Sequence, residues 1–163
     1  MIIEGKSIVL SYENDINTDL IIAGKYTKTL DMEELAEHVF EDLDENLKEN
    51  IKNKIIIVGE NFGCGSSREQ APLALLHGGV RAVIAKSYAR IFFRNAINIG
   101  LPVLTADTSV FSDGEDLLID LRDGTIKQGK TQELIKSNRM PEIMINILSK
   151  GGLIKYLKEE GSF

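Results

Sequence analysis

A ten-residue segment of this sequence carries the side chains best suited to chemistry. It reads Asn-Phe-Gly-Cys-Gly-Ser-Ser-Arg-Glu-Gln, occupies residues 61–70 and follows the apolar run 55–58. Gly63 and Gly65 permit backbone conformations that are closed to other residues, and they let a ligand approach the main chain. The two serines supply hydroxyl groups, and Arg68 can bind a carboxylate through two parallel hydrogen bonds. The pattern is typical of an active-site loop for an anionic substrate.

The same residues also match a capping box, the S-x-x-E pattern that opens many helices. Under that alternative the serines only begin a helix. Pro72 favours a later start near Glu69 or Gln70, because proline is comfortable only in the first turn of a helix. Ser66, Ser67 and Arg68 then lie at the mouth of the helix, where free N–H groups and the positive end of the helix dipole favour an anion.

Strands and helices alternate on both sides of this loop. Continuous apolar runs predict buried strands at 55–58 and 82–85 and a third from Val103, with helices expected at 71–76 and 88–99. This order predicts a parallel layer with right-handed crossovers and a ligand site at the carboxyl ends of the strands.

The remaining pattern predicts elements around that layer. We expect strands at 6–12 and 20–22, a helix capped by Asp31, a short polar helix or turn at 44–53, a hairpin of 115–121 with 125–128, and closing helices at 140–149 and 153–160. With 163 residues, the chain is expected to form a single domain over 1–163.

Charge and composition exclude several classes of function. The net charge is −6, so attraction to nucleic acid is not expected. The start of the sequence lacks a signal-peptide pattern and no apolar run is long enough to cross a bilayer, which predicts no membrane association and a cytoplasmic location. Lys86, Arg90 and Arg94 are nevertheless basic and could form a cationic pocket for a small anion.

Cys64 is the only cysteine in the sequence. It cannot form an internal disulfide, and by itself it cannot bind zinc or an iron–sulfur cluster, so no metal ligand is assigned. The two histidines, His38 and His77, lie on an expected acidic helix and at an expected helix end, and we expect both to be structural.

Three separated motifs carry a resemblance to a known family. They are Gly63-Cys64-Gly65-Ser66-Ser67-Arg68-Glu69, Asp15-Ile16-Asn17-Thr18-Asp19, and Lys86-Ser87-Tyr88-Ala89-Arg90-Ile91-Phe92-Phe93-Arg94-Asn95. In order and spacing they resemble the small subunits of 3-isopropylmalate dehydratase, which are similar to the swivelling C-terminal domain of aconitase. The resemblance implies a three-layer β/β/α swivelling domain, with a mixed, largely parallel, barrel-like sheet and flanking helices.

The resemblance also implies a chemistry. A hydro-lyase that interconverts 2-isopropylmalate and 3-isopropylmalate, a step of leucine biosynthesis, needs a base for a proton beside a carboxylate and a Lewis acid for the departing hydroxide. The resemblance gives Ser66 the role of the base, as an alkoxide, and gives Ser67 and Arg68 the role of binding the substrate. Asp19 matches an active-site aspartate of the family, and Thr18 beside it is a candidate substrate contact. From the sequence alone, a structural turn is an equal alternative for Asp19.

The Lewis acid of the family is one iron of a [4Fe–4S] cluster. Several cysteine thiolates hold such a cluster, and this chain has one cysteine. The resemblance therefore implies that the cluster lies on a partner large subunit, in a heterodimer or heterotetramer, and that this chain is inactive alone.

Residues 24–29 match the segment that selects the substrate in these subunits, with Tyr26, Lys28 and Thr29 as candidate contacts. Relatives that act on substrates with an extra carboxylate commonly carry Arg where Lys28 stands, whereas isopropylmalate enzymes present apolar groups nearby. A small dicarboxylic hydroxy acid is thus expected as substrate. Homoaconitase and other 2-alkylmalate dehydratases, such as dimethylmalate dehydratase, remain alternatives, as does a non-enzymatic module that only binds an anion.

Overall fold

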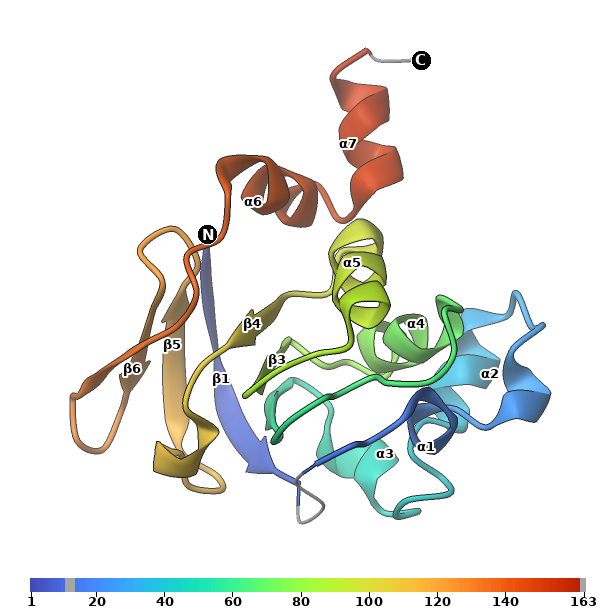
Figure 1. The fold of residues 1–163 in the computed structure, drawn as a ribbon, viewed down its shortest axis with the longest axis horizontal. Helices are drawn as coiled ribbons and strands as arrows, with labels where there is room; N and C mark the ends of the chain where they lie inside the picture. The colour runs from blue at the N-terminus through green and yellow to red at the C-terminus, as the bar shows by residue number, and fades with distance from the viewer. Residues whose placement is uncertain (11–13, 162–163) are drawn as a thin grey trace.

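The computed structural model describes residues 1–10 and 14–161, and within these ranges seven strands form one mixed sheet in the order β4-β3-β2-β1-β5-β6-β7 (Figure 1). Its parallel half contains β1 (Ile2–Val9), β2 (Lys54–Ile57), β3 (Ala82–Ala85) and β4 (Val103–Thr105). Its antiparallel half adds β5 (Asp116–Asp120), β6 (Thr125–Gln128) and β7 (Leu134–Lys136) on the other side of β1. This mixed sheet with flanking helices confirms the predicted fold class.

The helices are short and lie mostly beside the parallel half. They are α1 (Thr18–Ile21), α2 (Met32–Glu37), α3 (Leu47–Asn50), α4 (Gln70–His77), α5 (Arg90–Ile99), α6 (Glu142–Ser149) and α7 (Leu153–Glu159), with 3-10 turns η1 (Gly24–Tyr26) and η2 (Thr108–Val110). In Figure 1 the β5–β6 hairpin lies on one side of β1 and α4 and α5 lie on the other, with α6 and α7 at the top of the view. None of these described helices has the length and apolar composition needed to span a bilayer.

The central strands are buried because both of their faces are covered. Ile55, Ile56 and Ile57 of β2 and all four residues of β3 have almost no exposed surface. Their continuous apolar composition is what a strand covered on both faces requires. Ile56 pairs with Val83 in parallel, and β1 to β4 are neighbours in the sheet in the order of the sequence. Both observations confirm the predicted parallel layer.

Two predictions about local structure are wrong. The strand predicted at 20–22 does not form, and α1 covers most of these residues because the side chain of Asn17 accepts a hydrogen bond from the N–H of Leu20 at 3.0 Å and caps a helix. The strand predicted at 6–12 runs instead from Ile2 to Val9, and residues 11 and 12 lie outside the described ranges. Strand β7 was not predicted, since its three residues show no buried face.

The loop that follows β2, residues 58–69, lies on an aromatic cluster at the start of α5, and we call it the serine loop. Phe62 and Phe92 meet edge to face with ring centroids 5.2 Å apart, and Phe92 stacks parallel to Tyr88. The Tyr88 hydroxyl contacts the backbone oxygens of Val83 at 2.7 Å and Leu104 at 3.1 Å, and burial raises the pKa of Tyr88 well above its ordinary value. The cluster therefore joins the serine loop to strands β3 and β4.

Gly63 is the point of closest approach between the serine loop and this cluster. Its φ is +81°, and a Cβ built there would lie 2.1 Å from Cγ of Phe92. Gly63→Ala should lower the free energy of unfolding by at least about 2 kcal/mol, from backbone strain together with overpacking. The measurement is urea unfolding of the purified chain.

Gly114→Ala is the matched control, because Gly114 has a similar φ of +73° but no atom within 4 Å of the position that a Cβ would occupy. It should lower the free energy of unfolding by only about 1 kcal/mol, the cost of placing a residue with a Cβ at a positive φ. Equal losses in the two variants would show that the Phe92 contact does not constrain the loop.

Candidate active site

The predicted site residues meet where two parallel strands end. Backbone hydrogen bonds join the segment after β1 to the serine loop after β2: Asp15 N–H donates to Glu60 at 2.9 Å, Gly63 N–H to Ile16 at 2.8 Å, and Thr18 N–H to Cys64 at 2.8 Å. The two segments therefore form one unit at the carboxyl edge of the sheet, which is where parallel α/β sheets commonly bind ligands.

The side chain of Thr18 supports the backbone of the serine loop. Its side chain is buried, with 5% relative exposure, and its Oγ1 accepts a hydrogen bond from the N–H of Ser66 at 3.0 Å. A Cβ at Gly65 would lie 3.2 Å from the same oxygen, so the chain passes close above the threonine. The sequence predicted Thr18 as a substrate contact, and the structure places it as a hydrogen-bond acceptor beneath the loop.

The hydroxyl of Ser66 does not form a capping box. Its Oγ accepts a hydrogen bond from the N–H of Arg68 at 3.2 Å, before the helix begins. Helix α4 starts at Gln70 with Glu69 as its N-cap and no side-chain cap, as predicted from the position of Pro72. A donor directed at Ser66 Oγ stabilises negative charge on that oxygen and therefore favours its ionised form.

Arg68 and Ser67 are held by residues from other parts of the chain. The Nη1 of Arg68 donates to Oγ1 of Thr27, whose hydroxyl also donates to the carbonyl of Gly24 at 2.7 Å. The carbonyl of Ser67 accepts a hydrogen bond from Nδ2 of Asn95, on α5, at 2.7 Å. The serine loop is thus fixed on one side by α5 and on the other by residues 24–29, which we call the recognition segment.

Within the recognition segment, Tyr26 and Thr29 face α2 and its neighbouring turn. The ring of Tyr26 stacks on His38 at 4.1 Å, and His38 bonds to Glu41 at 2.7 Å, which lowers the pKa of that carboxyl. The Thr29 hydroxyl donates to Glu34 at 2.6 Å. In this conformation Tyr26 and Thr29 hold the recognition segment in place.

Lys28 and Asp19 are both exposed side chains. Asp19 lies on α1, with its Oδ1 3.9 Å from the position that a Cβ at Gly24 would occupy. The structure therefore places Asp19 next to the beginning of the recognition segment, and Lys28 in its exposed second half.

Cys64 supplies a single free thiol beside the site. Burial raises the pKa of its thiol, and the carboxylate of Asp15 raises it further, so the thiol stays protonated at neutral pH. A protonated thiol is a poor nucleophile. Among residues 1–10 and 14–161, no three His, Cys, Asp or Glu side chains are grouped to hold a metal ion. This donor set does not fit a [4Fe–4S] cluster, which needs several thiolates.

Comparison with known proteins identifies the family of this chain. The family model described as the aconitase C-terminal domain matches residues 2–108. The chain belongs to this family. It is 52% identical, over 149 residues, to 3-isopropylmalate dehydratase small subunit 1 of Archaeoglobus fulgidus, with 90% of this chain and 92% of that protein covered. It is 47% identical to the methanogen homoaconitase small subunit of Methanothermobacter thermautotrophicus, with 96% and 92% covered.

A solved structure of the family has the same fold. The crystal structure of 3-isopropylmalate dehydratase from Methanocaldococcus jannaschii superposes with a TM-score of 0.90 at 44% identity, and covers 99% of this chain and 96% of its own. The aconitase X of Thermococcus kodakaraensis, at 18% identity and a TM-score of 0.50, shares the fold alone.

Two residues that fix the site were not predicted as part of it. Asn95 lies within a motif that carries the family resemblance, yet nothing in its spacing indicates that its amide reaches the carbonyl of Ser67. Nothing in the sequence around Thr27 predicts a role in the site, apart from its place beside Lys28. Its contact with Arg68 depends on how two loops that are distant in the chain fold together.

Thr18→Val tests how much the buried hydroxyl supports the loop. The variant keeps the shape of the side chain but leaves the N–H of Ser66 without its acceptor, which should cost about 1–3 kcal/mol. We expect faster hydrogen exchange at the amides of residues 65–68, measured by mass spectrometry. Thr18→Ser keeps the acceptor and should exchange as the unmodified chain does; an identical rise in both variants would contradict the assigned role of Oγ1.

Proposed function

We propose that this chain is the small subunit of a hydro-lyase that isomerises 2-isopropylmalate and 3-isopropylmalate by dehydration and rehydration, in leucine biosynthesis. The observation that carries the proposal is the position of Ser66. Its Oγ accepts a hydrogen bond from the N–H of Arg68 at the carboxyl edge of the sheet, next to the recognition segment. The high identity to named small subunits of this enzyme, over nearly the full length of both chains, supports the same activity.

In this proposal Ser66 is the base. Serine ionises with difficulty in water, so the site must favour its alkoxide. The N–H of Arg68 donates directly to Oγ, and the positive charge of Arg68 and the uncapped N-terminus of α4 add a favourable potential. Ser66 Oγ then takes the proton from the substrate carbon beside a carboxylate, and returns it in the reverse direction.

Arg68 and Ser67 hold the substrate in the proposed mechanism. The guanidinium of Arg68 binds a carboxylate through two hydrogen bonds, and its hydrogen bond to Thr27 holds it beside the recognition segment before substrate arrives. Because Asn95 fixes the Ser67 carbonyl, the Ser67 hydroxyl is left on the exposed side of the loop for the substrate. Asp19 is assigned a place at the edge of the same site.

The electrophile that assists the departure of hydroxide must come from another chain. The donor set of this chain does not fit the [4Fe–4S] cluster, so we assign the cluster and its thiolate ligands to a large partner subunit, in a heterodimer or heterotetramer. The name "small subunit" carried by the relatives supports such a partner. We further place the complex in the cytoplasm, as expected from the sequence.

A second activity is favoured by one observation. Lys28 is exposed within the recognition segment, and a cation there suits a substrate with an additional carboxylate. The chain is also 47% identical to a methanogen homoaconitase small subunit. Homoaconitase activity, on homocitrate, is therefore the alternative, and dimethylmalate dehydratase belongs to the same class of 2-alkylmalate chemistry.

Ser66→Ala tests the proposed function. It should lower kcat of the two-subunit complex by at least about 100-fold, because a positioned base contributes that much or more. Stability should fall by only about 1 kcal/mol for the lost hydrogen bond. Ser149→Ala is the control, since Ser149 loses a comparable bond to the carbonyl of Asn146, on α6. Near-normal turnover of Ser66→Ala, with only a lower melting temperature, would make the serine a structural residue.

Substitution of Lys28 distinguishes the two candidate substrates. An unpaired carboxylate in a desolvated site costs several kcal/mol, so Lys28→Leu should favour isopropylmalate over homocitrate and Lys28→Arg should do the reverse. We expect the ratio of the two kcat/KM values to move about tenfold, equivalent to about 1.4 kcal/mol. Lys52→Leu serves as the control, since Lys52 forms an ion pair with Glu49, far from the recognition segment in the chain. A change below about twofold, or about 0.4 kcal/mol, would place the selectivity elsewhere.

A further inference from the structure

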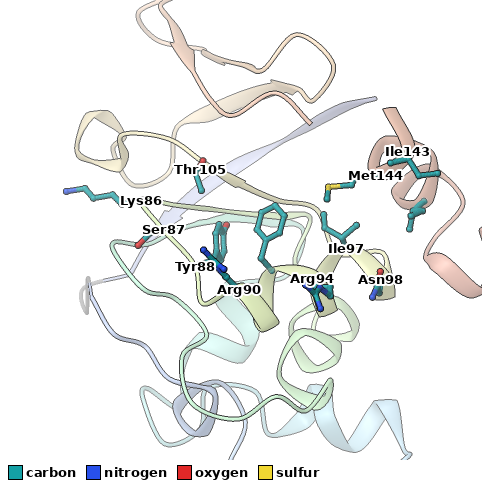
Figure 2. Close-up of a pocket in the computed structure, with 12 residues that line it drawn as sticks. Lys86, Ser87, Tyr88, Arg90, Arg94, Ile97, Asn98, Thr105, Ile143 and Met144 are labelled. Atoms are coloured by element: carbon teal, nitrogen blue, oxygen red, sulfur yellow. The ribbon is translucent and has the colours of Figure 1, made fainter. Parts of the chain in front are cut away.

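An apolar opening lies between α5 and α6. It is a pocket of about 550 Å³, which we call the α5–α6 pocket. Its lining includes Ser87 and Tyr88, then Arg90, Phe93 and Arg94 of α5, with Ile143 and Met144 of α6. Figure 2 shows Arg90, Arg94 and Ile97 along α5, with Ile143 and Met144 opposite on α6.

The pocket combines an apolar floor with an uncompensated positive charge. Ile143 is 49% exposed although it is a large apolar side chain. No carboxylate of the described residues pairs with Arg90 or Arg94, since the ion pairs that form involve other residues. Lys86 has one acidic neighbour, Asp107, whose pKa is lowered chiefly by hydrogen bonds from Ser109 and also by the charge of Lys86. In a chain of net charge −6, two unpaired arginines beside an apolar surface call for an anionic occupant.

The start of α5 strengthens this argument. The helix has no side-chain cap and no acidic residue in its first turn, and its first residue is Arg90. A cation at the positive end of a helix is unfavourable for the isolated chain, by about 0.3–1 kcal/mol. An incoming carboxylate would relieve that repulsion and would also accept hydrogen bonds from Arg90 and Arg94.

The pocket is continuous with the proposed catalytic unit. Ser87, which lines the pocket, accepts a hydrogen bond from the N–H of Asn61 at 2.8 Å, and Asn95, on the same helix as Arg94, holds Ser67. The serine loop and the first turns of α5 are therefore adjacent, and one partner surface can contact both. Arginine, tyrosine, phenylalanine and methionine, which all line this pocket, are also the residues enriched at the centres of protein interfaces.

We propose that the α5–α6 pocket is a docking site for the cluster-bearing large subunit. The occupant is a segment with an apolar side chain that packs on Phe93, Ile143 and Met144, flanked by carboxylates that pair with Arg90 and Arg94. This inference rests on the proposed function, because that function is what requires a large subunit. It assigns a binding surface separate from the residues that handle substrate.

The test measures the Kd between this chain and the cluster-bearing large subunit of the same organism, prepared anaerobically. The double variant Arg90→Glu/Arg94→Glu should weaken binding by at least about tenfold, equivalent to about 1.4 kcal/mol. Loss of folding does not explain such a result, because Arg90→Glu puts an acid at the positive end of α5, where it is favourable. The melting temperature of the variant should therefore not fall.

Ile143→Ser tests the apolar floor and should weaken binding by at least about fivefold, since an interface anchor of this kind is worth about 1 kcal/mol or more. The controls are Leu134→Ser, on β7, where Leu134 is 64% exposed, and Lys127→Glu/Lys136→Glu, two exposed lysines on β6 and β7. Both controls should leave Kd within about twofold of the original value, as expected for positions outside an interface.

Three results would overturn the docking proposal. They are an unchanged Kd for the arginine variant, equal losses in the variants and their controls, and a homodimer of the isolated chain that the arginine variant dissociates, which would make the occupant a second copy. Each can be told apart from failure of the proposed function. If the unmodified complex is active and Ser66→Ala is not, the function stands whatever the pocket variants show; if Ser66→Ala keeps full turnover while the arginine variant binds weakly, the docking site stands and the assigned base is wrong.

Discussion

The contact between the backbone of Gly63 and the ring of Phe92 fixes where the serine loop leaves the sheet. No side chain fits between them, since a Cβ at Gly63 would lie 2.1 Å from the ring. Phe92 is itself held by Phe62 and Tyr88, and Tyr88 is bonded to the carbonyls of Val83 and Leu104. The position of the loop is therefore set by β3 and β4, through an aromatic cluster that tolerates little movement.

From that point the loop is fixed by polar contacts with three other segments. Thr18 accepts from the N–H of Ser66, Asn95 donates to the carbonyl of Ser67, and Thr27 accepts from Arg68. Two of these bonds use backbone groups of the serines, and none of them uses a serine hydroxyl. Such preorganisation matters for a serine base, because the donors that stabilise its charge must already be in place when the proton moves. Our proposals assign the proton transfer and the binding of the substrate carboxylate to this chain, and they assign the electrophile and the remaining wall of the site to a second subunit docked beside it.

The sequence predicted the centre of the fold better than its margins. Residues 55–58 and 82–85 are continuous apolar runs of strand length, and they form the buried strands β2, which ends at Ile57, and β3. Leu20-Ile21-Ile22 is equally apolar but folds as part of a helix, because the side chain of Asn17 caps it. Strand β7 has no buried face, so its sequence shows no alternation that predicts a strand. It forms by antiparallel pairing with β6.

In the candidate site, too, some features could be predicted from the sequence and others could not. The serine loop could be found from residue types alone, and Pro72 correctly located the start of α4. The supporting role of Thr18 could not be predicted, since its hydroxyl reaches a residue 48 positions away in the chain. Tyr26 and Thr29 lie in the segment that the family resemblance marks for substrate recognition, yet their observed partners, His38 and Glu34, are on or near α2. Contacts of this kind follow from the folded path of the chain and leave no periodic signal in the sequence.

The most direct test of the account is a reconstitution. The purified, iron-free chain is assayed for the interconversion of 2-isopropylmalate and 3-isopropylmalate, first alone and then in increasing amounts with a fixed, anaerobically prepared cluster-bearing large subunit. We predict no turnover by the chain alone, and turnover with the large subunit that rises until the two subunits are present in a fixed ratio. Turnover by the isolated chain, or turnover of the large subunit that does not depend on this chain, would contradict the proposal that the two subunits share one active site.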